Sequence, residues 1–159
     1  MLFRSRQGFL ATLRQDIAKF AKYCEKRGIQ PVVRLNGTSD IMWEKHIDME
    51  TEFPMVQFYD YTKIVKRVYK ALPSNYHLTL SYSEANVDYA WEVIEAHQKT
   101  GTNIAVVFRE PTTKSPLPLA SALLDGDKDD LRFLDEQGVV VALYAKGRAK
   151  KDASGFVIG

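Results

Sequence analysis

The sequence predicts a single α/β domain over residues 1–159, made of repeated strand–helix units around a mainly parallel sheet of about five strands. Three observations lead to this fold class. Short apolar runs recur along the chain, and helical patterns separate several of them. Successive runs start 21 to 35 residues apart. That spacing is typical of strand–helix units joined by right-handed crossovers. An open sheet and part of a barrel both satisfy these observations.

The apolar runs are short and rich in β-branched residues, as strands are. Runs that can be buried on both faces are also what a parallel sheet needs. The predicted strands are Val32–Leu35, Val56–Tyr59, His77–Leu80, Ile104–Phe108 and Val139–Leu143.

Two segments have the periodicity of amphipathic helices. The first covers residues 9–27 and ends at Gly28, and we expect it to cover one face of the sheet with Phe9, Leu13, Ile17 and Phe20. The second runs from about Val87 to Lys99, with Asn86 as its N-cap and Gly101 as its end. Its expected apolar stripe is Val87, Ala90, Trp91 and Ile94.

Composition excludes several classes of protein. The chain has 159 residues, 45% of them hydrophobic and 26% charged, which is typical of a globular domain. A single cysteine, Cys24, excludes an intrachain disulfide, a four-cysteine zinc site and a cysteine-held iron–sulfur cluster. No signal-peptide core and no apolar run of roughly 18 residues occurs, so we expect a cytoplasmic protein without a membrane partner.

Polar residues follow the predicted strands, where parallel sheets bind their ligands. If the strands are parallel, these side chains converge on one rim of the sheet. A second explanation stays open: these residues are polar because they lie in solvated loops, and they bind no ligand. The ligand-binding candidates at the rim are Arg34, Asn36, Ser39, Asp40, Tyr59, Tyr61, Thr62, Ser81, Lys146 and Arg148.

Three further rim residues are candidates for catalysis. Asp60 or Glu84 could serve as a general base if it is shielded from water. Lys63, together with Arg34, could hold an anionic substrate. The residues identify no reaction, so whether the protein is an enzyme stays open.

Neither a metal site nor a cofactor is expected. The acidic segment Asp125–Asp130 resembles a calcium loop, but Asp130 occupies the position that needs glycine and Arg132 follows at the eighth position. We therefore expect a solvated acidic turn before the last strand. The three histidines lie in separate segments without the spacing of metal ligands.

Basic residues cluster after two predicted strands. Cations on one rim would contact phosphates, so we expect weak, salt-sensitive and sequence-indifferent binding of nucleic acid at most. The acidic turn should lie at the opposite end of the sheet or fold back to screen them. The two clusters are Lys63, Lys66, Arg67 and Lys70, and Lys146, Arg148, Lys150 and Lys151.

Five segments together resemble a family of phage and conjugative-plasmid proteins described as gene product eighty-eight. They are PVVRLNGTSDIMWE (31–44), VQFYDYTKIVKR (56–67), YHLTLSYSEAN (76–86), NIAVVFRE (103–110) and GVVVALYAKGRAKKDASGFVIG (138–159). The resemblance covers nearly the whole chain. The family's recurring polar positions match the rim derived above and add Trp43 to the ligand-binding candidates.

The resemblance implies two possible functions. The first is a phage- or plasmid-encoded accessory protein that binds a host macromolecule, such as an anti-CRISPR or anti-restriction inhibitor acting on a host protein complex. The alternative is an enzyme or degenerate enzyme, because longer members carry an upstream cysteine cluster that suggests distant kinship with radical S-adenosylmethionine barrels. With Cys24 as the only cysteine, we expect a short form of the family without iron–sulfur chemistry.

Overall fold

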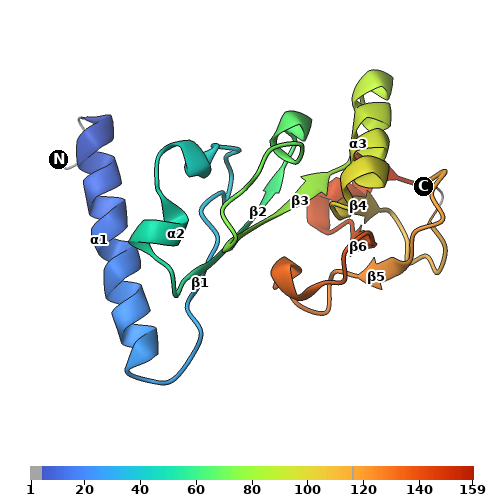
Figure 1. Cartoon of the computed structure of the whole chain (residues 1–159). Helices are drawn as coiled ribbons and strands as arrows, with labels where there is room; N and C mark the ends of the chain where they lie inside the picture. The colour runs from blue at the N-terminus through green and yellow to red at the C-terminus, as the bar shows by residue number, and fades with distance from the viewer. Residues whose placement is uncertain (1–4, 116) are drawn as a thin grey trace. The chain divides into compact units, whose positions relative to one another are not determined.

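The computed structural model describes residues 5–115 and 117–159, and these residues form a sheet of seven strands (Figure 1). The order is β1-β2-β3-β4-β6-β5, and β7 pairs with β4 outside this path. Parallel pairing joins β1 to β2, β3 to β4, β4 to β6 and β7, and β5 to β6. The strands are β1 Val32–Val33, β2 Gln57–Thr62, β3 Tyr76–Ser81, β4 Ile104–Phe108, β5 Leu123–Asp125, β6 Val140–Tyr144 and β7 Val157–Ile158.

The predicted fold class is confirmed: the protein is α/β, with a mainly parallel sheet that is open and does not close into a barrel. All five predicted strands are present, as β1, β2, β3, β4 and β6. The sequence did not predict β5 or β7, because both are very short.

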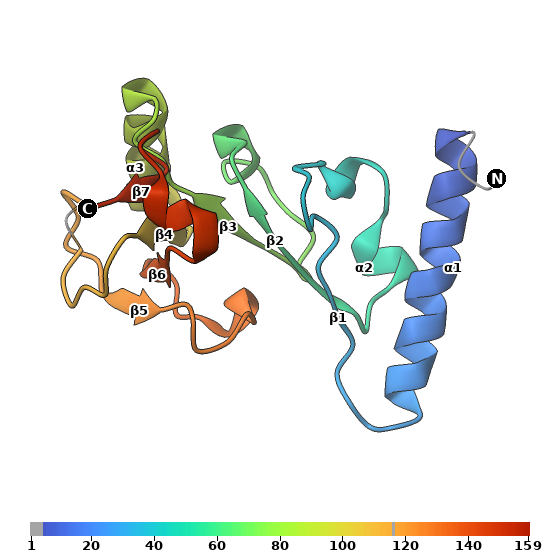
Figure 2. The same cartoon turned by 180° about the vertical axis from the view of Figure 1, so that it is seen from behind.

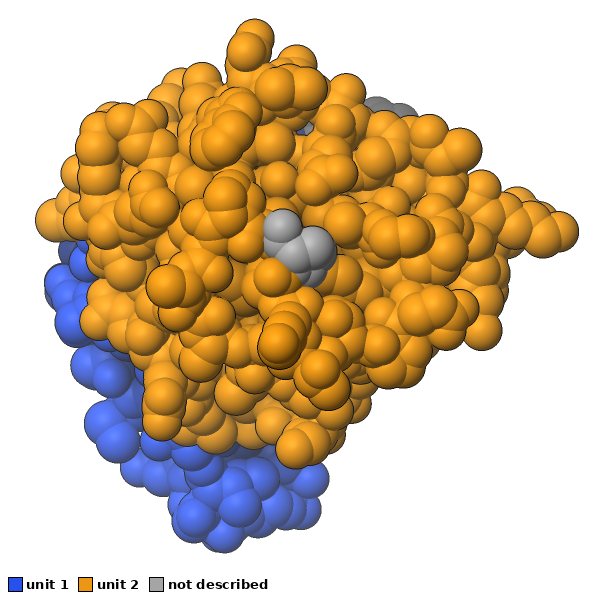
Figure 3. Space-filling view, turned by 90° about the vertical axis from the view of Figure 1, so that its right-hand side faces the viewer, with its two compact units in different colours: residues 1–59, 72–77 blue, residues 60–71, 78–159 orange. Residues whose placement is uncertain are grey.

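The chain divides into two compact units, coloured separately in Figure 3. Unit 1 comprises Met1–Tyr59 and Leu72–His77, and unit 2 comprises Asp60–Ala71 and Leu78–Gly159. Of the three boundaries, one falls within β2, one within β3 and one between these two strands. That residues 1–159 form a single domain stays a prediction.

Helix α1 of unit 1 spans Arg6–Glu25, which confirms the first predicted helix with shifted ends. Ser5 caps it, because its hydroxyl accepts a hydrogen bond of 3.0 Å from the Gly8 amide. Gly28 has a φ of 63°, and this left-handed conformation takes the chain out of the helix. The buried side chains are Ile17 and Cys24. Phe9 and Phe20, expected in the core, are 37% and 41% exposed because they lie on the flank of that stripe.

Helix α3 of unit 2 spans Val87–Thr100, with Asn86 as N-cap and Gly101 at its end, as predicted. Its buried stripe differs from the expected one, since Val87 and Trp91 are 66% and 58% exposed. The helix instead buries Ala90, Val93, Ile94, Ala96 and His97. None of the helices in the described part of the chain combines the length and apolar character needed to cross a membrane.

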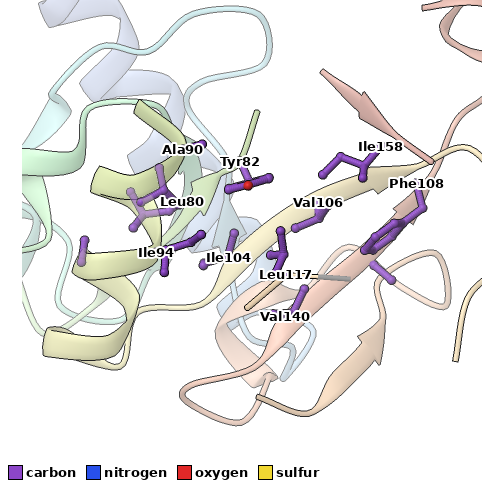
Figure 4. Close-up of a cluster of buried hydrophobic side chains, with 13 residues drawn as sticks. Leu80, Tyr82, Ala90, Ile94, Ile104, Val106, Phe108, Leu117, Val140 and Ile158 are labelled. Carbon is purple, nitrogen blue, oxygen red and sulfur yellow. The ribbon is translucent and has the colours of Figure 1, made fainter. Parts of the chain in front are cut away.

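The core of unit 2 lies between α3 and one face of the sheet (Figures 2 and 4). On this face lie the side chains of Ile104, Val106 and Phe108 from β4 and of Val140 from β6. Intervening residues such as Val141 belong to a smaller cluster with Ala105. Both faces of β4 and β6 are therefore apolar, as expected for parallel strands. Burying a side chain the size of Ile104 stabilises the fold by about 1.5–3 kcal/mol.

In unit 1, Asn75 holds the turn that leads from α2 (Met49–Glu52) into β2. Its side-chain Nδ2 lies 3.0 Å from each of three carbonyl oxygens, those of Met49, Phe53 and Val56. Its own carbonyl accepts a hydrogen bond of 2.7 Å from the Phe58 amide. One amide group thus fixes the end of a short helix that has little stability alone.

We expect Asn75→Ala to lower the free energy of unfolding by about 1–3 kcal/mol, because three carbonyls lose their donor. Asn75→Asp should cost more, since it turns a carboxylate toward three carbonyl oxygens. Urea unfolding measures both changes, with the exposed position Gln98→Ala as control. Equal stability of Asn75→Asp and the wild type would contradict this role of Asn75.

Candidate functional site

The predicted site residues are divided between the two units. Each group is described within its own unit. Unit 1 holds Arg34, Asn36, Ser39, Asp40, Trp43 and Tyr59. Unit 2 holds Asp60, Tyr61, Thr62, Lys63, Ser81, Glu84, Lys146 and Arg148.

In unit 1, Asn36 is the centre of a hydrogen-bonded loop after β1. Its Oδ1 accepts hydrogen bonds from the Ser39 hydroxyl at 2.9 Å, the Ile41 amide at 3.0 Å and the Trp43 indole N–H at 2.9 Å. Its Nδ2 donates to the Ile41 carbonyl at 3.0 Å. Asn36 is only 3% exposed. Its side-chain oxygen is therefore already saturated by this loop.

Trp43 begins the short 3₁₀ helix Trp43–Lys45 and is buried in unit 1. Its ring centroid lies 6.2 Å from that of Phe9 and 6.3 Å from that of His46. These contacts hold the loop against α1, which supports a structural role for Trp43. Arg34 and Ser39 are exposed, so of these candidates they are the most accessible to a ligand.

In unit 2, the end of β2 is largely buried. Asp60 and Thr62 are 0% and 1% exposed, whereas Tyr61 is half-buried and Lys63 is exposed. Arg67, in the 3₁₀ helix Val65–Arg67, donates from Nη1 to the Thr62 hydroxyl at 3.2 Å. The structure corrects the expectation that Arg67 faces phosphates: its side chain turns inward to Thr62 and is buried.

The chain's own segment 152–158 occupies the carboxyl end of the sheet in unit 2. Strand β3 pairs with the first half of β4, and β7 pairs with the second half. The Glu84 amide donates to the Gly155 carbonyl at 2.7 Å. Gly155 has a φ of 90°, and a Cβ atom there would lie 2.7 Å from the Ala85 amide nitrogen. The segment therefore lies directly on the residues that follow β3.

Glu84 also interacts with Tyr82, whose hydroxyl donates to the carboxylate at 3.4 Å. Burial, with a smaller effect of the Glu84 charge, raises the pKa of Tyr82 to about 12. The phenol is thus protonated at neutral pH and acts as a donor. The Glu84 carboxylate is exposed.

Arg109 fixes the segment that ends in β7. Its Nε donates to the Gly159 carbonyl at 2.6 Å and one Nη to the Asp152 carbonyl at 2.8 Å, while the other Nη donates to the Lys150 carbonyl. A single guanidinium thus binds carbonyls on both sides of β7. The sequence does not reveal that Arg109 binds backbone carbonyls, because its three partners lie at least 41 residues away along the chain.

The acidic segment after β5 is organised around a buried arginine. Arg132 is 0% exposed and forms ion pairs with Asp129 at 3.2 Å and Asp135 at 3.3 Å. Burial raises the pKa of Asp135, and the Arg132 charge opposes this rise. The expected solvated acidic turn is therefore correct only in part. Its four aspartates are exposed, but Gly126 is buried and the segment folds around Arg132.

The acidic turn lies at the same end of the sheet as the last basic cluster, because β5 and β6 are parallel. The Asp127 carboxylate lies 3.1 Å from the Lys146 ammonium, so the turn folds back onto one of these cations, the second of the two expected arrangements. Arg148, Lys150 and Lys151 of the 3₁₀ helix Gly147–Lys151 are exposed. Within residues 5–115 and 117–159, no group of three or more His, Cys, Asp or Glu side chains is placed to hold a metal ion.

Unit 1 contains an open groove that the sequence did not predict. Its volume is about 570 Å³. Most of its lining is apolar, and Met55 and Ile29 in the lining turns are 72% and 51% exposed. The only sequence signal was apolar residues inside proline-containing turns. The lining residues are Ala18, Ala21, Lys22, Glu25, Gly28, Ile29, Gln30, Pro31, Glu52, Phe53, Pro54, Met55 and Val56.

The catalytic candidates do not line this groove. A smaller hollow in unit 2, of about 270 Å³, is formed by residues between 65 and 69 and by α3, among them Lys66 and Glu92. Neither hollow is lined by Asp60, Lys63 or Glu84. Their catalytic roles stay predictions.

A comparison with protein families gives a match over the entire chain. The model of the family described as Gene product 88 matches residues 1–159. Neither the curated proteins nor the solved structures contain a match to the chain. The resemblance seen in the five sequence segments is thereby confirmed.

Asp152 gives unit 2 a pH-dependent contribution to stability. Its carboxylate accepts hydrogen bonds from the Val157 amide at 3.1 Å and the Ser154 hydroxyl at 2.8 Å, and these bonds lower its pKa below the usual 3.8. The contribution is therefore complete above pH 3.8 and is lost as the pH falls through the lower pKa of the folded state.

We expect Asp152→Asn to unfold at a lower temperature than the wild type at pH 6, because one carboxylate acceptor becomes an amide donor. This difference should shrink once the pH falls below the folded-state pKa, where the wild-type carboxyl is also protonated. Thermal unfolding followed by circular dichroism at several pH values measures it. Glu110→Gln, at an exposed carboxylate, is the control. A difference that is independent of pH would contradict the assignment.

Proposed function

The chain belongs to the Gene product 88 family, and we propose that it is a phage- or plasmid-encoded accessory protein that binds a host protein. The proposed target is a protein complex of a host defence system, such as a CRISPR or restriction complex. This target is motivated by the mobile-element setting that the resemblance implies. The proposed activity is inhibition by binding and includes no chemical step.

The observation that carries the proposal is the apolar groove of unit 1. Met55 is 72% exposed, although a methionine gains about 1.5–3 kcal/mol when it is buried. Ile29 stands beside it in the same lining at 51% exposure. Exposed apolar residues that gather at one hollow are typical of protein interaction sites. Methionine also adapts its shape to a partner.

The polar candidates favour binding over catalysis because several of them serve the fold. The side-chain oxygen of Asn36 accepts hydrogen bonds from Ser39, Ile41 and Trp43. The segment 152–158 lies at the carboxyl end of the unit 2 sheet, where a substrate of this fold class would bind. These arrangements leave fewer polar groups free for a reaction.

Capture from host lysate tests the proposal. The tagged wild-type chain should retain a specific host protein, and Met55→Glu should reduce its recovery at least about tenfold, because a charge in an apolar contact costs more than 1.4 kcal/mol. Leu134→Glu is the matched control, because Leu134 is 69% exposed in unit 2, outside the groove. Quantitative mass spectrometry measures recovery.

The control must behave like the wild type. Recovery of the same protein by wild type and Met55→Glu alike would remove the groove from the interaction. If no host protein were retained above background, the binding function would fail.

A second candidate is weak binding of single-stranded nucleic acid by unit 2. Arg148, Lys150 and Lys151 are exposed on a turn whose backbone Arg109 fixes. A fixed turn presents its cations at a constant spacing, which suits a phosphate backbone. Lys66 lies apart from this turn, since it lines a hollow with Glu92 and Glu95.

Fluorescence anisotropy with a labelled oligonucleotide tests this candidate. Three phosphate contacts should give a slope of about −2 in a plot of log affinity against log salt. Arg148→Glu with Lys150→Glu should abolish binding at low salt, whereas Lys66→Glu should leave it unchanged. Binding that ignores salt, or that survives the double reversal, would exclude this turn as the contact.

A further inference from the structure

We infer that the groove of unit 1 receives an amphipathic helix whose apolar face is bordered by acidic residues. This inference rests on the proposed binding function and specifies the chemistry of the partner. Three features carry it: a row of lysines on and just after the helix that forms one wall, backbone groups that are already occupied, and the helical wall itself.

The lysine row consists of Lys19, Lys22 and Lys26. Spacings of three and four residues place them on one side of the helical turn. Lys22 itself lines the groove, and all three are exposed. Lys19 has a 3.8 Å ion pair with Asp16, but both side chains are at least 65% exposed, so water weakens this pair.

The acidic groups of the lining do not cancel this row. Glu52 is held by the Arg14 guanidinium, whose Nη2 donates to it at 3.1 Å. Among the described residues that line the groove, Glu25 is the one other carboxylate, and it offsets one of the three lysines. The border of the groove along α1 is therefore positive and complements a negatively charged partner.

The backbone of the groove favours a helix over an extended strand. A strand would need free amide and carbonyl groups for pairing. Pro31 and Pro54 have no amide hydrogen. The Pro31 carbonyl already accepts from the Gln57 amide at 2.9 Å, and the Met55 carbonyl accepts from the Gln30 side chain at 2.8 Å. A helix satisfies its own backbone and needs only side-chain contacts.

The helical wall sets the reach of the contact. The lining residues from Ala18 to Glu25 span two turns of α1, about 12 Å. A partner helix can lay apolar side chains at positions i, i+3, i+4 and i+7 along such a wall. Met55 and Ile29 would then cover its apolar face from the opposite side.

The test uses two synthetic helical peptides of about five turns, with leucine at the same apolar positions and either glutamate or lysine on the flanks. Anisotropy with the full chain at low salt should show the glutamate peptide binding at least about tenfold more tightly than the lysine peptide. Added salt should reduce this ratio. Met55→Glu should weaken both peptides.

Charge reversal decides the role of the lysine row. The triple variant Lys19→Glu, Lys22→Glu, Lys26→Glu should reverse the preference between the peptides. The triple variant Lys70→Glu, Lys114→Glu, Lys128→Glu, at exposed positions of unit 2, changes the net charge equally and should not reverse it. Circular dichroism confirms folding, and replacement of the row by glutamine, which should abolish the preference, provides a milder second test.

The outcomes separate this inference from the proposed function. Equal binding of both peptides, or a preference that survives the first triple variant, would overturn the acidic helix. Concentration-dependent self-association that Met55→Glu abolishes would assign the groove to a second copy instead, which also overturns it. If Met55→Glu reduced capture of a host protein but the lysine-row variant did not, the proposed binding function would stand. The inference that the partner is an acidic helix would then be wrong.

Discussion

The structure of unit 2 depends on the burial of β4 between parallel strands. Strand β6 pairs along its whole length, while β3 and β7 share its other edge. The backbone groups of such a strand must be satisfied within the sheet. Parallel neighbours can be reached only by connections that return the chain to the same end. All the connections from β3 to β7 are therefore crossovers, and they determine where polar side chains can lie.

Two of these crossovers have only a short 3₁₀ helix in place of an α-helix, and each is organised by an arginine. Between β5 and β6 the chain winds around Arg132, whose charge is held by Asp129 and Asp135. Gly126 is required above it, since a Cβ atom there would lie 2.9 Å from Arg132 Nη1 and 2.4 Å from a Val141 methyl. Between β6 and β7, Arg109 binds backbone carbonyls of the crossover. A guanidinium with several fixed donors can organise a loop that has too few apolar residues to pack.

Sequence patterns predicted the parts of the fold that depend on local periodicity. The buried strands and the caps of α3 follow from apolar runs, Asn86 and Gly101. Sequence patterns did not predict β7, because its two residues become a strand only through pairing with β4, which lies far away in sequence. For the candidate site, the sequence identifies the polar residues that follow the strands. It does not show whether their side chains face solvent or the protein interior. Composition alone cannot distinguish an arginine facing solvent from Arg132, which faces carboxylates. The groove of unit 1 depends on how α1 meets the turn at Met55, which is a tertiary property.

One edge of β4 pairs first with β3 and then with β7, and these two partners lie at different distances along the chain. Leu80 and Ile104, which pair between β3 and β4, are much closer in sequence than Val107 and Val157, which pair between β4 and β7. Closing the longer loop costs more chain entropy. We therefore expect the two-residue strand β7 to detach before β3 and β6 during local unfolding. Hydrogen exchange at Ile158 should then report a different opening event from exchange at Val106, although both residues belong to the same core.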